Sequence, residues 1–71
     1  MQYEAIVELL DWAGGHEQAV RITTSDHNTV HGVPTQVDTH VAAHEVYVRP
    51  LGIDDTEIAI SLGAIESVEL M

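Results

Sequence analysis

Two long runs of alternating apolar and polar residues occupy the middle of the chain. The first covers Thr29 to Val37 and the second Val41 to Leu51, with Asp38-Thr39-His40 as a bend between them. Alternation with a period of two places successive side chains on opposite faces of a strand. The two runs therefore predict an antiparallel pair that forms the spine of a small, strongly bent β-barrel.

Three shorter alternating segments complete the expected sheet, and each is bounded by turn-forming residues. They cover Gln18 to Thr24, Thr56 to Leu62 and Ile65 to Leu70. Inside the first long run, Gly32 and Pro34 would weaken a flat ladder, and such residues mark bulges or sharp bends. We expect five strands in one domain spanning residues 1–71, with the last two forming a hairpin.

A helix is predicted before the first strand, over Tyr3 to Ala13. Ile6, Leu9, Leu10 and Ala13 recur at helical spacing, and Gly14-Gly15 follows as a stop signal of the kind that forms a left-handed cap. Val7 and Trp12 widen the apolar face. The pattern predicts a helix that lies on the sheet, with Trp12 as an anchor in the core.

The composition bounds the size and the stability of this core. The chain has 71 residues, no Phe and one Trp, so Val, Ile, Leu and Ala must supply most of the interior. A domain this short often needs stabilisation beyond its hydrophobic core, and the absence of Cys excludes a disulfide or a zinc ribbon. We therefore expect association between subunits to supply the additional stability.

Charge narrows the class of partner. Twelve Asp and Glu stand against two Arg and no Lys, which gives a formal charge of −10. Such a chain repels a phosphate backbone, because affinity for nucleic acid begins with cations that neutralise phosphates. The acidity is also compatible with adaptation to high salt, where acidic surfaces without Lys stay soluble, and with docking onto a basic protein.

Several residues between Gly32 and Gly63 match two short signatures that occur together in one family of small β-barrels. Gly32, Asp38 and His40 stand in the register of the first family signature, although Ala42 replaces its Asn. In the second signature, Ile60-Ser61-Leu62-Gly63 keeps the glycine and replaces the basic residue with Leu62. The chain thus resembles a divergent Sm/LSm-like domain, bacterial or phage.

The resemblance implies a ring whose lumen holds RNA, with the residue at the His40 position stacking on a base. Because the Asn and the basic residue hold that base in the family, we expect a weakened uridine-type pocket formed by Asp38, His40 and Gly63, with Arg49 or Arg21 supplying charge. In charge and layout the chain also looks like the Rho-binding antiterminators of the Rof type, which occupy an RNA-binding surface on a protein partner.

Our first functional hypothesis is a noncatalytic module that acts through protein contacts, with a regulatory role in RNA metabolism or transcription. It either forms homo-oligomers by strand-edge pairing or uses that edge and its acidic face on a protein partner. An unblocked strand edge is a template for another strand. The segment Thr56 to Leu62 carries no Lys and no Pro, and it would pair with Ile65 to Leu70 of a neighbour. The residues expected at this oligomer edge are Glu57, Ile58, Ala59, Ile60, Ile65 and Val68.

Two further interpretations concern charge and ligands. Glu57, Glu66 and Glu69, with Glu45 on the preceding strand, form either a solvated sheet face or an acidic docking patch for a basic protein partner. The alternative functions are the ring-forming RNA-binding protein described above and, as a third, a barrel that binds a small molecule, for which the core leaves little room.

No catalytic constellation, cofactor motif or metal site is expected. The histidine pairs His27/His31 and His40/His44 are each four residues apart, which in a strand means about 13 Å, too far for one ion. The chain lacks a Cys nucleophile, and its Ser residues stand in no recognisable nucleophile motif. The acidic N-terminal segment and the lack of a long apolar run predict a cytoplasmic protein without membrane contact.

Overall fold

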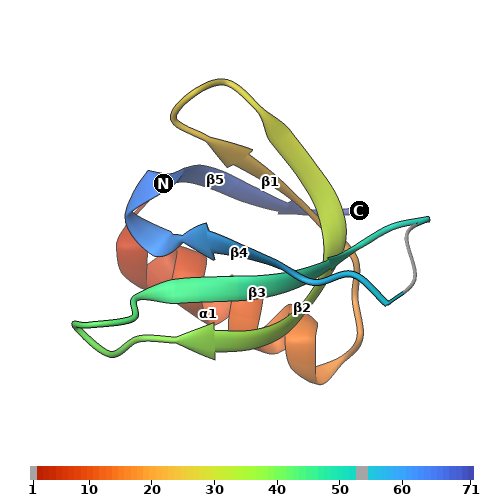
Figure 1. The fold of residues 1–71 in the computed structure, drawn as a ribbon, viewed down its shortest axis with the longest axis horizontal. Helices are drawn as coiled ribbons and strands as arrows, with labels where there is room; N and C mark the ends of the chain where they lie inside the picture. The colour runs from red at the N-terminus through yellow and green to blue at the C-terminus, as the bar shows by residue number, and fades with distance from the viewer. Residues whose placement is uncertain (1, 53–54) are drawn as a thin grey trace.

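The computed structural model describes residues 2–52 and 55–71 and shows one helix followed by a five-stranded antiparallel sheet (Figure 1). This confirms the predicted mostly-β class with a leading helix. The residues Gly52-Ile53-Asp54-Asp55 predict a turn, and Ile53 and Asp54 of this segment lie outside the described residues. The elements are α1 (Tyr3–Gly15), β1 (Val20–Thr24), β2 (Thr29–Asp38), β3 (Glu45–Pro50), β4 (Ile58–Ser61), the 3-10 turn η1 (Leu62–Ala64) and β5 (Ile65–Leu70).

The order of strands in the sheet is β4-β3-β2-β1-β5. Consecutive strands β4 and β5 therefore stand at opposite ends of the order, and the hairpin expected between them is wrong. The 3-10 turn η1 separates them, so that β4 pairs with β3 while β5 pairs with β1 (Figure 1). Both β4 and β5 are edge strands in the described part of the chain.

Helix α1 packs against β2 and β5 and lies behind the strands in Figure 1. Ile6, Leu10 and Ala13 face the core as predicted. The helix continues through both glycines, so the predicted stop after Ala13 is wrong, and the left-handed residue beyond its end is Glu17, with φ of 51°. Among residues 2–52 and 55–71, no helix is long and apolar enough to span a membrane.

The core forms between α1 and the concave side of the sheet. The inward direction of Val46 and Val48 is confirmed, and both are fully buried. The prediction that Trp12 is an anchor in the core is wrong, because its side chain is 47% exposed. At 100° per residue, Trp12 lies about 200° around the helix from Leu10, so the side chain leaves the core-facing stripe. The buried hydrophobic residues are Ile6, Leu10, Ala13, Val20, Ile22, Val46, Val48, Leu62, Ile65 and Val68.

The bend predicted in the second strand lies between Pro34 and Gln36, where the β2–β3 register shifts by one residue. Gly32 serves a different purpose, because a Cβ there would come within 2.5 Å of the Arg49 carbonyl oxygen and 2.7 Å of Val48 Cγ1. Strand β3 thus approaches β2 so closely that Gly32 has no room for a side chain.

The third strand is shorter than predicted, since β3 begins at Glu45 and not at Val41. The intervening residues form a tight turn in which the N–H groups of Ala43 and His44 both donate to the carbonyl oxygen of His40, at 3.1 and 2.8 Å. The alternation of Val41 with polar neighbours is therefore part of a turn. Val41 is 99% exposed at its tip.

Candidate functional site

Three segments that are distant in sequence meet at one end of the molecule: the start of α1, the loop between β2 and β3, and η1. The Leu62 N–H donates to the carbonyl oxygen of His44 at 3.1 Å. The Tyr3 hydroxyl lies 3.4 Å from Nδ1 of His44, and the two ring centroids are 5.0 Å apart. His44 therefore connects the loop to both other segments.

Asp38 is the last residue of β2 and His40 lies in the loop that follows, where the His40 N–H donates to the Asp38 carboxylate at 3.0 Å. Gly63 is exposed in η1, next to the residue that bonds to His44. Three of the four residues predicted for an RNA pocket thus lie at the same end of the molecule. Arg49 does not join them, because it lies four residues beyond Glu45 along β3, a distance of about 13 Å.

The electrostatics of this end are negative. Asp38 pairs with Glu45 across β2 and β3, and the Tyr47 hydroxyl donates to Glu45 Oε1 at 2.7 Å. The Glu45 carboxylate, through this hydrogen bond and its charge, raises the pKa of Tyr47 above the ordinary 10.0. The arrangement offers aromatic rings for stacking, but its carboxylates oppose a phosphate group.

Sequence reasoning did not find Tyr3 or the role of His44 in this cluster. The two residues are 41 positions apart, and neither belongs to a motif. Their contact depends on α1 packing across β2, so no local pattern in the chain signals it.

The prediction that His40 and His44 are about 13 Å apart assumed that both lie in a strand, and this assumption is wrong. These residues lie in a tight turn closed by an i to i+4 hydrogen bond, not in a strand. Even so, within residues 2–52 and 55–71 no group of three or more His, Cys, Asp or Glu side chains is arranged to hold a metal ion. His27 adopts φ of 67° in the β1–β2 turn, and His31 is exposed on β2.

The open edge of β4 can be defined from the bond between Leu62 and His44. Antiparallel residue pairs alternate between hydrogen-bonded and non-hydrogen-bonded. Since Leu62 bonds to His44 in the register that pairs Ile60 with Val46, the Ile60 pair is hydrogen-bonded and the Ala59–Tyr47 pair is not. The N–H and C=O of Ala59 therefore point away from β3.

The same reasoning applies to β5. The Met71 N–H donates to the Ala19 carbonyl oxygen at 3.1 Å, in the register that pairs Leu70 with Val20 and Val68 with Ile22. The backbone groups of Val68 and Leu70 thus point to the side opposite β1. Ile65 and Val68, which we predicted at an oligomer edge, have their side chains in the core, so they can offer backbone groups alone.

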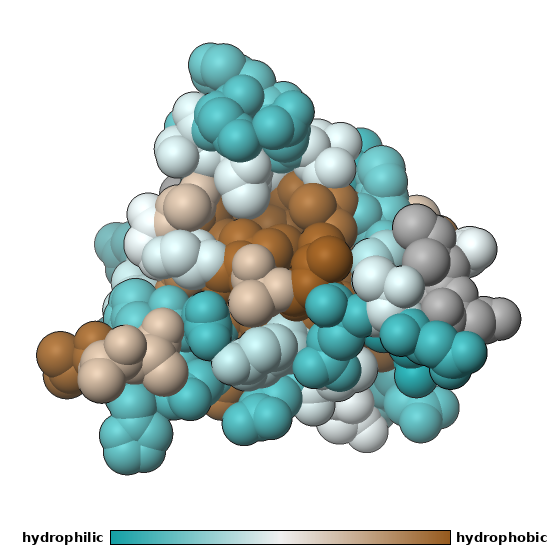
Figure 2. Space-filling model, in the orientation of Figure 1, coloured by the Kyte–Doolittle hydropathy of each residue, from teal (hydrophilic) through white to brown (hydrophobic). Residues whose placement is uncertain are grey.

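A hydrophobic area is visible between the β1–β2 arm and the strands β3 and β4 in Figure 2, flanked by hydrophilic residues. It lies on the side of the molecule where β4 and β5 run without pairing (Figure 1). Val30 in β2 and Ile58 and Ile60 in β4 are among the hydrophobic residues that are only partly buried and pack against the core. The open seam between the edge strands is therefore apolar.

The four glutamates predicted as one acidic face are divided by the strand order. Glu57 precedes β4 and Glu45 lies on β3, whereas Glu66 and Glu69 lie on β5 at the other end of the order. Three of the four glutamates interact with nearby side chains. Glu57 accepts a hydrogen bond from Thr35, Glu45 accepts one from Tyr47, and Glu69 forms an ion pair with Arg21. They do not form the outer face of a hairpin.

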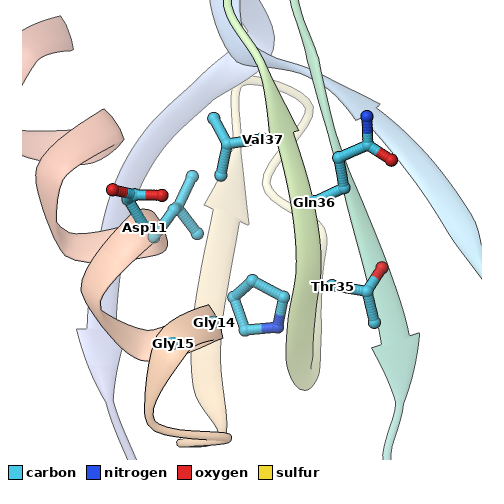
Figure 3. A pocket seen from close by; sticks show the side chains of 8 residues that line it. Asp11, Gly14, Gly15, Thr35, Gln36 and Val37 are labelled. Atoms are coloured by element: carbon cyan, nitrogen blue, oxygen red, sulfur yellow. The ribbon is translucent and has the colours of Figure 1, made fainter.

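A shallow cavity of about 250 Å³ separates the last turns of α1 from the bulged part of β2 (Figure 3). Asp11 and Val37 point into the space between helix and strand, while Thr35 and Gln36 lie on the other side of the β2 ribbon (Figure 3). Asp11 is the single ionisable residue of its lining. One carboxylate without a base or a second acid gives this cavity no catalytic pair.

Comparison of the chain with known protein families, curated proteins and solved structures finds no match. The candidate sites are therefore interpreted from the geometry of the chain's own residues.

Proposed function

We propose that this protein is a noncatalytic, cytoplasmic module of the Sm-like kind that acts by self-assembly and protein contacts. The observation that carries the proposal is the pair of open strand edges, β4 and β5, with an apolar seam between them. In an assembly, β4 of one copy pairs with β5 of the next. Such heterologous pairing continues from copy to copy until a ring closes.

The β4 edge has the features of a pairing surface, whereas β5 carries a register irregularity at Glu66 and is regular from Ser67 to Leu70. Native edge strands are normally protected by Lys, Pro or bulges. Residues Ile58–Ser61 contain no Lys or Pro, and their register with β3 is regular. Ala59 on β4 and Val68 and Leu70 on β5 present backbone donors and acceptors, and Ile58 and Ile60 would be covered by the neighbour.

Charge opposes this assembly, since each copy carries a formal charge of −10. Repulsion between like-charged subunits is screened by salt, with a Debye length of about 10 Å at 0.1 M and 3 Å at 1 M. We therefore expect assembly to strengthen as the salt concentration rises.

The test is the mass in solution, measured by light scattering at low and at molar salt. We expect a closed oligomer that is favoured by salt, and we expect Ala59→Pro to reduce it to the monomer, because proline removes an outward-pointing N–H. Ala59→Val keeps that N–H and is the matched control. A monomeric wild type at both salts, or an unchanged mass for a folded Ala59→Pro, would refute edge pairing.

A second candidate function is RNA binding with a weakened uridine-type pocket. It is favoured by one observation, the adjacency of the Asp38–His40 loop and the η1 turn that contains Gly63. Binding of fluorescent oligouridine at low salt would fall with salt and with His40→Ala, but not with His16→Ala, which lies beyond the opposite end of α1 from Tyr3. No change in anisotropy for the wild type would exclude this function.

A further inference from the structure

The outer side of α1 carries two parallel stripes, one apolar and one acidic, that are largely exposed. Residues Ala5, Leu9 and Trp12 recur at positions i, i+4 and i+7 and form the apolar stripe, of which Ala5 and Trp12 are exposed, while Leu9 is partly buried against the core. Directly beside it, Glu4, Glu8 and Asp11 repeat the same spacing as an acidic stripe. Helix α1 contains no Lys or Arg.

The apolar stripe is hollowed and its aromatic residue is held in place. A shallow hollow of about 420 Å³ is lined by Ala5, Glu8, Leu9 and Trp12. The Trp12 ring stacks on His16 with centroids 4.2 Å apart, and His16 Nδ1 donates to the Trp12 carbonyl oxygen at 2.8 Å. A half-exposed tryptophan fixed in this way resembles the anchors that dominate binding energy at protein interfaces.

The chemistry of a partner follows from the two stripes together. From Ala5 to Trp12 the apolar stripe is about 10 Å long, which matches two turns of a facing helix with anchors at i, i+3 or i+4 and i+7. Carboxylates along one side require Lys or Arg at the corresponding side of that helix. We infer that the outer face of α1 docks a basic amphipathic helix of a partner protein.

This inference is independent of the proposed assembly, because the edges β4 and β5 contribute nothing to the hollow. It also places the basic partner on a different surface from Glu45 of β3, Glu57 before β4, and Glu66 and Glu69 of β5.

The experiment titrates the full chain with a synthetic basic peptide of Leu and Lys, patterned as an amphipathic helix, and follows the emission of Trp12, the one tryptophan of the chain. We expect saturable binding with a blue shift as the ring is covered. A scrambled peptide of the same composition is expected to bind at least about tenfold more weakly.

Matched variants separate local docking from the overall negative field. The double variant Glu4→Gln/Glu8→Gln is expected to weaken binding about tenfold, whereas Glu57→Gln/Glu66→Gln, with the same change in charge, weakens it less than about twofold. Ala5→Gln, which fills the hollow while keeping a good helix former, is expected to weaken binding about fivefold. Circular dichroism checks that each variant is folded.

Equal binding of the patterned and scrambled peptides, equal effects of the two double variants, or binding without a shift in Trp12 emission would overturn the proposal. A blue shift of the Trp12 emission that follows protein concentration in the absence of peptide would also overturn the proposal, because a second copy of the chain would then cover this face. Repeating the titration with Ala59→Pro separates the two proposals, since docking is expected to persist when assembly is lost.

Discussion

The N–H of Leu62 donates to the carbonyl oxygen of His44 at 3.1 Å, and this bond decides which backbone groups of β4 face β3. Because antiparallel pairs alternate, the backbone groups of Ile60 are hydrogen-bonded to β3 and those of Ala59 point away from it. This difference between Ile60 and Ala59 can be tested in the monomer, without any assembly.

Proline substitutions at the neighbouring positions Ala59 and Ile60 of β4 are expected to have different effects on the stability of the monomer. Ala59→Pro removes an outward N–H and leaves the β3–β4 ladder intact, whereas Ile60→Pro removes a ladder bond and leaves an acceptor unpaired. We expect Ile60→Pro to lower the free energy of unfolding by about 2 kcal/mol more than Ile60→Ala, which controls for the lost side chain. Urea denaturation of the monomer measures it, and equal effects of Ile60→Pro and Ile60→Ala would contradict the assigned register.

Gly32→Ala is expected to destabilise the fold by about 2 to 4 kcal/mol, because the added Cβ meets the Arg49 carbonyl oxygen at 2.5 Å. Gly15→Ala is the control, since a Cβ there meets nothing within 4 Å and alanine favours the helix. We expect it to be neutral or to stabilise by about 0.5 kcal/mol. Denaturation midpoints that fall equally for the two variants would refute the close approach of β2 and β3.

Truncation of Leu10, which is fully buried, tests whether α1 belongs to the core. We expect Leu10→Ala to cost about 2 to 5 kcal/mol in the free energy of unfolding through lost burial and a residual cavity. Val41→Ala, at a side chain that is 99% exposed, is expected to change it by less than about 0.5 kcal/mol. A small effect at Leu10 would mean that the helix is not docked.

Asp26 in the β1–β2 turn is expected to contribute stability that acid removes. The Thr24 hydroxyl, then the Asn28 N–H, donate to its carboxylate and lower its pKa below the ordinary 3.8. Since the folded pKa lies below the unfolded one, this stability is present above pH 3.8 and is lost as the pH falls through the folded pKa. Titration by NMR is expected to show a depressed pKa that returns toward 3.8 in Thr24→Val; an unchanged pKa in Thr24→Val would contradict the assigned cause.

Salt is expected to stabilise the monomer. Twelve acidic residues face two Arg, and the single ion pair among the described residues joins Arg21 to Glu69, so net repulsion strains the folded chain. We expect molar sodium chloride to raise the melting midpoint of Ala59→Pro by about 5 °C. The variant Glu57→Gln/Glu66→Gln, with less repulsion, is expected to gain less, and an equal gain would point away from charge.

The sequence predicted those features that depend on local repetition. The apolar spacing of Ile6, Leu10 and Ala13 gave the helix and its buried face, and the alternation around Val46 and Val48 gave the third strand and its inward residues. The predicted ends of the elements were less accurate, because the helix continues through Gly14 and Gly15, and Val41 lies in a turn and not in a strand. A period can be followed along the chain, but the point where hydrogen bonding stops depends on what packs beside it.

The candidate surfaces depended more on tertiary structure. That the segments carrying β4 and β5 are strands follows from their alternation, but their separation to opposite ends of the sheet does not, because a tight turn such as Leu62–Ala64 is compatible with a hairpin as well as with a change of partner. Likewise, Trp12 is apolar and lies on the predicted helix, yet its exposure is set by how α1 is rotated over β2.

The sequence by itself determined the class of fold, the strong negative charge and the absence of cysteine chemistry, because these follow from composition and from periodicity within single segments. The tertiary structure alone decided which edges stay open, which glutamates are neighbours, and that Tyr3 meets His44. Those relationships join residues far apart in the chain, and they arise from long-range packing that no local pattern encodes.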